Sequence, residues 1–253
     1  MDVICDLDGV IWLADKPIPG SPEAVERLRS AGHCVLFLTN NSNPTVADLV
    51  GKLAGMGIPA EPDQIATSSQ AAALLVEPGR RALVCGGDGV AEALRERGVE
   101  PVREGDADAV VVGFHREFDY KRLTAAFRAV IGGARLIGTN DDPTYPTPDG
   151  PVPGGGSLLA AVATAAGVEP TVAGKPYEAM GRLVASRLGD HLEGTVLIGD
   201  RPSTDGLMAA RLGVSFVLVR TGVKEEPDES IPVDAAAADL ASVVDQAGNI
   251  VAL

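Results

Sequence analysis

The chain has 253 residues, 45% hydrophobic and 22% charged, which is typical of a folded globular protein with one large or two modest domains. Its 21 Lys and Arg against 35 Asp and Glu give a net charge of -14, which argues against nucleic acid and anionic membranes as partners. The three cysteines lack paired spacing, and no signal-like region or long apolar run is present, so a cytoplasmic protein is expected.

Short apolar runs alternate with helical patterns in the first part of the chain. Such alternation predicts parallel strands connected by helices that cover a central sheet, so the predicted fold class is α/β. The predicted strands are Val3 to Cys5 and Cys34 to Leu38, and the predicted helices are Glu23 to Ala31 and Thr45 to Met56.

The alternation continues after residue 80. A loop rich in Pro and Gly, Asn140 to Gly156, interrupts it and is expected to be a fixed irregular loop or a hinge. A short helix, Asp239 to Gln246, is expected to close the chain. The other predicted strands are Ala82 to Cys85, Ala109 to Gly113, Arg135 to Thr139, Thr195 to Ile198 and Phe216 to Val219, and the other helices are Val90 to Arg97, Tyr120 to Ile131, Leu158 to Ala166 and Asp205 to Leu212.

Two carboxylates follow the first strand directly. Asp6 and Asp8 are separated by one residue, so an extended chain would point both side chains to the same side. In an open α/β sheet, ligands bind just beyond the carboxyl ends of the strands. Two adjacent carboxylates repel unless a cation lies between them or one is protonated, so the pair indicates Mg²⁺, acid/base chemistry, or both. A pair of turn or capping aspartates is the structural alternative.

The second predicted strand is followed by Thr39 and Asn40, ahead of a predicted helix. Hydroxyl and backbone N–H groups at such a junction suit a phosphoryl oxygen, because helix amino ends favour anions. An ordinary helix cap by Asn41 or Ser42 is the alternative.

Lys175 lies between a glycine and a proline, ahead of a helical segment. This placement orders a long cation, which could hold a nucleophilic carboxylate and a transferring phosphoryl group together. A surface lysine in a turn is the alternative.

Another strand end carries Asp200, followed five residues later by Asp205. From these positions Asp200 can reach a metal at the strand tip, and Asp205 can orient the groups around it. Helix capping by Ser203 or Thr204 accounts for the hydroxyls of the loop but not for Asp200.

These four segments in this order resemble the haloacid dehalogenase superfamily of phosphohydrolases. The segments are DLDGV at 6–10, LTNNS at 38–42, GKP at 174–176 and GDRPSTD at 199–205. The long insertion between the second and third resembles the class IIA branch, which includes nitrophenyl, phosphoglycolate, glycerol phosphate and pyridoxal phosphate phosphatases and NagD-like nucleotidases. The resemblance implies a Rossmann-like core at 1–78 and 171–253 with an α/β cap at 79–170.

The resemblance also implies a role for each motif residue. Asp6 would attack phosphorus and form an aspartyl phosphate, while Asp8 would protonate the leaving oxygen and then activate water. Mg²⁺ would be held by Asp6, the backbone carbonyl of Asp8 and Asp200, with Asp205 behind them. The phosphoryl oxygens would be bound by Thr39, the Asn40 backbone and Lys175. The expected substrate is a small phosphorylated metabolite.

In relatives, a cap loop corresponding to 139–146 reaches the substrate. The resemblance therefore implies that Asn140, Asp141 and Tyr145 contribute to specificity, although Tyr145 could equally fill the cap interior. The same relatives often dimerise through the cap, so a homodimer is expected. Pro202 and Ser203 depart from the residues that relatives often carry, which puts the geometry of that loop in doubt.

Four other functions are alternatives to phosphatase activity. A signalling receiver domain accepts phosphate on a strand-end aspartate without turnover, but such domains are much shorter than this chain. A carbon–halogen hydrolase of the superfamily would not need Asp8 or Asp200. A phosphomutase would leave phosphate on a sugar product. A small-molecule binder without catalysis would leave the complete motif set without a purpose.

Overall fold

The computed structural model describes residues 1–147, 150–189, 191–225, 228 and 230–251. Two compact units make up the chain: the first contains residues 1–39, 48–66 and 181–253, and the second contains residues 40–47 and 67–180. Both are built on parallel sheets, which confirms the predicted α/β class. The second unit begins before and ends after the range 79–170, and the assignment of that range as a cap stays a prediction.

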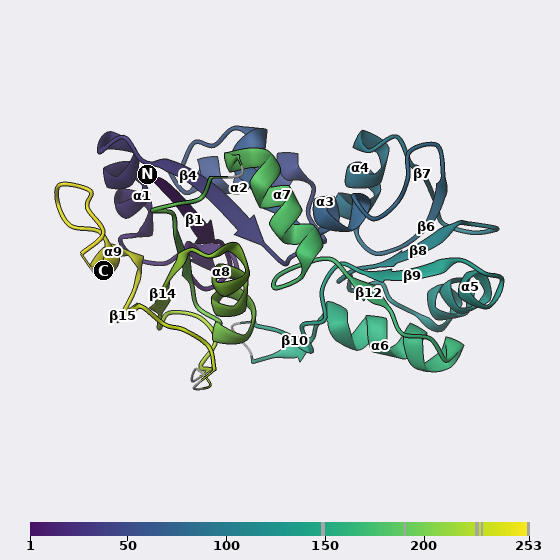
Figure 1. The fold of residues 1–253 in the computed structure, drawn as a ribbon. Coiled ribbons are helices and arrows are strands. Elements are labelled where there is room, and N and C mark those ends of the chain that lie inside the picture. Colours follow the sequence, from purple (N-terminus) through teal and green to yellow (C-terminus); the bar gives the residue numbers. More distant parts are fainter. Residues whose placement is uncertain (148–149, 190, 226–227, 229, 252–253) are drawn as a thin grey trace. The chain divides into compact units, whose positions relative to one another are not determined.

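The first unit contains a six-stranded sheet in the order β15-β14-β13-β1-β4-β5 (Figure 1). Strand β1 lies inside this sheet, paired in parallel with β13 on one side and β4 on the other. The strands are β1 (Asp2–Asp6), β4 (Cys34–Thr39), β5 (Ile65–Thr67), β13 (Val196–Gly199), β14 (Ser215–Val219) and β15 (Ala235–Ala237). Asp6, at the carboxyl end of β1, is therefore held between two neighbouring strands rather than at an edge of the sheet.

Helices and a short hairpin complete the first unit. The hairpin strands β2 (Trp12–Leu13) and β3 (Lys16–Pro17) follow β1 directly. The helices are α1 (Ser21–Ser30), α2 (Val46–Gly55), α7 (Glu178–Leu188), α8 (Leu207–Leu212) and α9 (Leu240–Val243), of which α2 and α7 begin just outside the unit, and a 3₁₀ turn spans Pro62–Gln64. Fully buried Ile4, Phe37 and Phe216 show that the sheet carries the core.

The second unit contains a five-stranded parallel sheet in the order β12-β9-β8-β6-β7. Helices α5 and α6 pack side by side on one face of this sheet, and α3 packs with α4 (Figure 1). The elements are α3 (Ser68–Ala73), β6 (Arg81–Cys85), α4 (Asp88–Glu96), β7 (Glu100–Val102), β8 (Ala109–Val112), α5 (Tyr120–Ile131), β9 (Arg135–Gly138), α6 (Gly155–Ala166) and β12 (Thr171–Val172). Strand β8 is entirely buried, as expected for a parallel strand covered on both faces.

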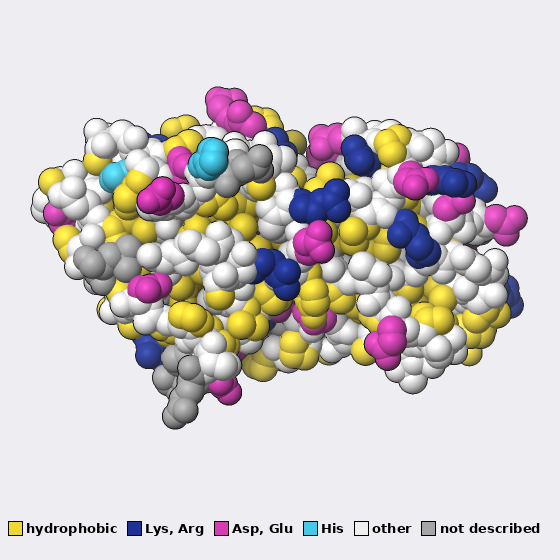
Figure 2. Space-filling model, viewed as in Figure 1, with side chains coloured by type: hydrophobic (Ala, Val, Ile, Leu, Met, Phe, Trp, Pro, Cys, Tyr) yellow, Lys and Arg dark blue, Asp and Glu magenta, His cyan; other side chains and the backbone are white. Residues whose placement is uncertain are grey.

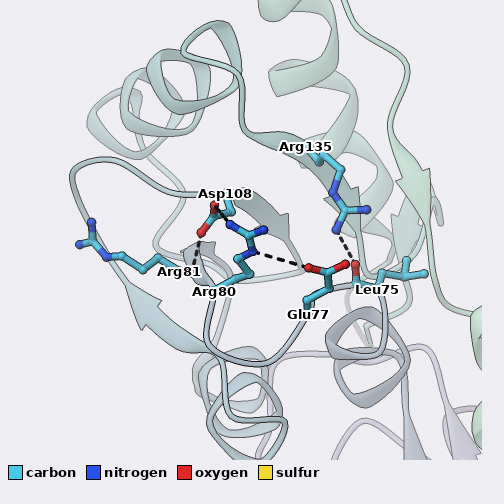
Figure 3. A network of polar contacts seen from close by, with 6 residues as sticks. All are labelled: Leu75, Glu77, Arg80, Arg81, Asp108 and Arg135. Atoms are coloured by element: carbon cyan, nitrogen blue, oxygen red, sulfur yellow. Dashed lines mark hydrogen bonds and ion pairs between the residues drawn. The ribbon is translucent and has the colours of Figure 1, made fainter.

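Polar contacts join the segments that lead into β6, β8 and β9 (Figure 3). Asp108 accepts hydrogen bonds from the Arg81 backbone N–H at 2.9 Å and from the Arg80 guanidinium at 3.3 Å. The Arg135 guanidinium donates to the Leu75 carbonyl at 2.6 Å. Because these side chains are exposed, the network fixes local chain direction more than it adds stability.

The loop predicted at 140–156 contains regular structure. A short antiparallel hairpin pairs β10 (Thr144–Tyr145) with β11 (Val152–Pro153), and α6 begins at Gly155 rather than at Leu158. A side chain at Gly156 would meet the Asp141 carbonyl oxygen at 2.2 Å, so the glycine lets the helix start lie against the loop. The part of the predicted loop at 148–149 lies outside the described residues.

The closing helix is shorter than predicted. It is α9, Leu240–Val243, whose amino end is capped by the Asp239 carboxylate accepting from the Ser242 N–H at 2.8 Å. Val244 then adopts extended backbone and bridges Ile250, which ends the helix before Gln246. The β2–β3 and β10–β11 hairpins and the short strands β5, β7, β12 and β15 were not predicted, because runs this short carry no clear periodicity.

Figure 2 shows acidic and basic side chains of the described residues interspersed over the face that it draws. On that face neither the acidic nor the basic side chains gather in one large patch. None of the described helices is both long enough and apolar enough to cross a membrane.

Candidate active site

The carboxyl end of β1 turns back on itself immediately. The Leu7 carbonyl accepts from the Ile11 N–H at 2.9 Å and the Trp12 N–H at 3.2 Å, and the Gly9 N–H donates to the Trp12 carbonyl at 2.7 Å. Gly9 adopts a φ of 94°, which favours glycine. This tight turn places the side chains of Asp6 and Asp8 at the end of a central strand.

Three buried carboxylates meet at this end of the sheet. Asp6, Asp200 and Asp205 each place a carboxylate oxygen within 4.8 Å of the other two, and they are 5%, 5% and 1% exposed. Like charges this close in a poorly solvated place repel strongly. Hard cations such as Mg²⁺ prefer carboxylate oxygens, so the donor set fits the predicted metal.

Asp200 follows β13 and is enclosed by backbone. A side chain at Gly9 would meet Asp200 Oδ2 at 2.4 Å, and one at Gly222 would meet it at 1.8 Å. The Val223 N–H donates to the same oxygen at 2.6 Å. The two glycines therefore leave room for the carboxylate, and the N–H fixes its orientation, neither of which the sequence analysis anticipated.

Asp205 lies within a π-helical turn, Pro202–Gly206, that precedes α8. Its carboxylate accepts from the Arg201 N–H at 3.1 Å, while its own N–H donates to the Arg201 carbonyl at 2.8 Å. The α-helix predicted from Asp205 therefore begins at Leu207, because residues 202–206 form the π-helical turn. Its predicted role behind the metal ligands stays a prediction, although its oxygen lies within the cluster.

The loop carrying Pro202 and Ser203 is fixed by a residue that sequence reasoning missed. Glu225 accepts from the Ser203 N–H at 2.8 Å and from the Ser203 hydroxyl at 2.9 Å. A carboxylate that accepts two hydrogen bonds from one residue restrains that residue closely. The departure at Pro202 and Ser203 is thus accompanied by a specific partner within the first unit.

Asp8 lies outside the three-carboxylate cluster and has a different environment. The Trp12 indole N–H donates to Asp8 Oδ1 at 3.0 Å, and the Thr39 hydroxyl donates to Asp8 Oδ2 at 3.3 Å. Thr39, predicted to bind phosphate, is thereby placed beside Asp8. The two neighbouring carboxylates Asp6 and Asp8 therefore differ in their partners, as separate chemical roles require.

Asn40 and Lys175 meet in the second unit. The Asn40 side chain accepts from the Lys175 N–H at 2.7 Å and donates to the Lys175 carbonyl at 3.1 Å. A side chain at Gly174 would meet Asn40 Oδ1 at 2.5 Å, so this glycine permits the contact. Lys175 is 2% exposed, so it is not a surface lysine in a turn.

The three predicted specificity residues have partners within the second unit. The Asn140 amide donates to the Asn40 carbonyl at 2.7 Å, and Asp141 accepts from the Tyr177 hydroxyl. This hydrogen bond, and to a smaller extent burial, raises the pKa of Tyr177 to about 12. Tyr145 stacks on Phe114 with ring centroids 4.9 Å apart. Their part in substrate selection stays a prediction.

Asn40→Ala should lower the free energy of unfolding by about 2 kcal/mol, because two backbone partners at Lys175 lose their hydrogen bonds. Asn41→Ala is a suitable control, since the Asn41 side chain accepts an exposed hydrogen bond from the Asn43 N–H. Urea unfolding of the two variants measures the difference. Equal stability losses in both would contradict a special role for the Asn40 amide.

Known protein families and individual proteins resemble this chain in sequence. A haloacid dehalogenase-like hydrolase family model matches residues 3–100, and a HAD-hydrolase-like model matches residues 172–245. Dihydroxyacetone phosphatase of Corynebacterium glutamicum is 35% identical, with 89% of this chain and 82% of that protein aligned. The 5'-nucleotidase YutF of Bacillus subtilis is 34% identical, with 87% of each aligned.

A solved structure is also similar. The glycerol phosphate phosphatase of Mycobacterium tuberculosis in complex with magnesium matches with a TM-score of 0.86 at 32% identity. The match covers 95% of this chain and 75% of that one. Similarity at this level extends over both units of the present chain.

Proposed function

The chain belongs to the haloacid dehalogenase-like hydrolases, and from this membership we propose that it hydrolyses a small phosphometabolite through an aspartyl phosphate on Asp6. That it is a phosphatase, with Mg²⁺ as cofactor, follows from its relatives and from the buried carboxylate cluster. The predicted family is thus confirmed. The relatives also support placing the chain in the class IIA branch.

One observation carries the proposal. Asp6 belongs to a cluster of three buried carboxylates suited to a cation, whereas Asp8, two residues later, contacts Trp12 and Thr39 instead. A carboxylate beside a cation stays ionised, as a nucleophile must. A carboxyl group outside that cluster can carry a proton and transfer it.

In the first proposed step, a carboxylate oxygen of Asp6 forms a bond to phosphorus. The bond between phosphorus and the leaving oxygen breaks, and Asp8 transfers a proton to that oxygen. The organic product leaves as an alcohol, and Asp8 is left ionised. The phosphoryl group remains on Asp6 as an acyl phosphate.

In the second step, Asp8 takes a proton from a water molecule as the water oxygen bonds to phosphorus. The bond between phosphorus and Asp6 breaks, so inorganic phosphate forms and the Asp6 carboxylate is restored. Asp8 is protonated again and ready for another substrate. Each residue thus returns to its starting state after one turnover.

Asp6, Asp200 and the backbone carbonyl of Asp8 are the proposed ligands of Mg²⁺, and Asp205 is proposed to orient them. When bound, Mg²⁺ would supply positive charge that offsets the negative charge of both the phosphoryl oxygens and the carboxylates. The glycines around Asp200 and the Val223 N–H hold that ligand in place. The hydrogen bond from Arg201 does the same for Asp205.

The remaining roles are carried by the family resemblance. Thr39, the Asn40 backbone and Lys175 are proposed to bind phosphoryl oxygens, and Asn140, Asp141 and Tyr145 to select the organic part. Substrates named for the relatives, a triose phosphate and a nucleotide, set the chemical class to test here. Assembly as a homodimer through residues 79–170 and a cytoplasmic location are further proposals.

The full chain with Mg²⁺ should release inorganic phosphate catalytically from at least one member of a panel of phosphometabolites. Measured kcat/KM across the panel would rank the substrates, and the same reactions in excess chelator serve as the control. A phosphorylated protein that forms once and releases no phosphate would indicate a signalling receiver. Recovery of the phosphate on a sugar product would indicate a phosphomutase.

A further inference from the structure

Trp12 is the only tryptophan of the chain and is 1% exposed. Its indole N–H points to Asp8 Oδ1 at 3.0 Å. It lies outside the four segments that carry the family resemblance. It lies in β2, which the tight turn after β1 brings back beside Asp8.

The face of the indole ring is contacted by Lys52. The Lys52 ammonium lies 4.3 Å from the ring centroid and donates to the Ala14 carbonyl at 2.6 Å. Ala14, in the turn of the β2–β3 hairpin, has a φ of 52°, which residues other than glycine rarely adopt. A cation over the ring draws electron density from it, so the N–H becomes a better donor. The ring position is therefore fixed by two contacts, the hydrogen bond to Asp8 and the Lys52 ammonium over the ring.

An indole N–H can only donate a hydrogen bond, whereas a hydroxyl can donate or accept. The Trp12 N–H therefore always donates to Asp8 Oδ1. When the Asp8 carboxyl group is protonated, Oδ1 is best suited to be its unprotonated, carbonyl oxygen. The Thr39 hydroxyl contacts Oδ2, and it can accept a hydrogen bond instead of donating one when Oδ2 carries a proton. The two oxygens of Asp8 are thus chemically unequal.

We propose that Trp12 is a positioning residue for proton transfer by Asp8: its N–H fixes the carboxyl plane and leaves the transferable proton on Oδ2. This inference rests on the proposed function, because it assumes that Asp8 is the acid. Trp12 itself exchanges no proton and touches no substrate. Its effect should appear only in reactions whose leaving oxygen needs the proton.

The test compares two substrates that differ in this need. An alkyl phosphate such as glycerol phosphate has a leaving oxygen that must be protonated, whereas the p-nitrophenolate ion can leave unprotonated. The ratio of kcat/KM for the two substrates isolates cleavage of the ester bond. For Trp12→Phe we expect the alkyl phosphate kcat/KM to fall about tenfold, and that of p-nitrophenyl phosphate less than about twofold.

A second replacement guards against a folding defect. Because the chain has a single tryptophan, benzothienylalanine, which has sulfur in place of the N–H, can replace Trp12 alone by residue-specific incorporation. It should shift the substrate ratio as Trp12→Phe does, with the packing preserved. Asp15→Asn, which removes only the exposed ion pair to Lys52, is the control and should leave the ratio unchanged.

A double-mutant cycle with Asp8→Asn decides the mechanism. If Trp12 acts through Asp8, Trp12→Phe should cause no further selective loss in the Asp8→Asn background. An equal loss on both substrates, an unchanged ratio, or the same selective loss without the Asp8 carboxyl would overturn the inference. Full turnover of glycerol phosphate by Asp8→Asn alone would instead overturn the proposed role of Asp8.

Discussion

Asp6→Asn should lower phosphate release by about a thousandfold or more, as expected when the nucleophile of a covalent mechanism is lost. The amide is nearly the same size as the carboxylate, so the strand and its neighbours keep their packing. It lacks the negative charge needed to attack phosphorus. A phosphate-release assay at saturating substrate and Mg²⁺ measures the effect.

The same substitution should leave the fold intact. Removing one of three buried carboxylates relieves repulsion with Asp200 and Asp205, so Tm in chelator should not fall. Asp2→Asn, at the other end of the same strand, is a matched control that should keep full activity. Acid-quenched wild-type protein should carry a base-labile phosphoryl group that Asp6→Asn lacks. Normal turnover by a sequence-verified Asp6→Asn protein would refute the proposed nucleophile.

Sequence reasoning predicted the parallel sheets because buried parallel strands are nearly continuous apolar runs. Strands such as β8 and β13 have four buried residues each and were located to within about a residue. Motif spacing also pointed to Asp6, Asp200 and Asp205: Asp6 ends β1, Asp200 follows β13, and Asp205 lies in the turn before α8. The structure places their oxygens together, as a metal site requires.

The partners of these residues were not predictable in the same way. Trp12 and Glu225 contact Asp8 and Ser203 through a two-residue strand and a loop, neither of which has a periodic pattern. The bond between Asn40 and the Lys175 backbone joins residues 135 positions apart. A single sequence contains no signal for such contacts, because many polar residues could occupy either position.

The two glycines that surround Asp200 also differ in how far sequence alone identifies them. Gly9 follows Asp8 in the first motif, and its φ of 94° belongs to the tight turn after β1. Gly222 belongs to no motif, yet a side chain there would occupy the position of Asp200 Oδ2. The need for glycine is visible only when the second backbone segment is in place. Gly222 is therefore a site residue that sequence alone could not identify.

Asp200→Asn should raise the Mg²⁺ concentration needed for half-maximal activity by about 100-fold or more. The loss of a direct ligand should exceed the 10–100-fold typical of groups that only orient ligands. The amide oxygen can still accept from the Val223 N–H, which directs the amide nitrogen to the other position of the carboxylate. That nitrogen carries hydrogens and cannot bind a cation.

Two measurements separate lost metal binding from a disturbed loop. Mg²⁺ titration of activity gives the shift directly, and Mg²⁺ should raise Tm of the wild type but not of Asp200→Asn, because ligand binding to the native state stabilises it. Glu225→Gln is the matched control: it alters the partner of Ser203 in the same loop but lies outside the carboxylate cluster, so its Mg²⁺ requirement should stay within about twofold. If Asp200→Asn kept the wild-type Mg²⁺ dependence while Glu225→Gln lost it, the loop around Ser203, rather than the buried cluster, would hold the metal.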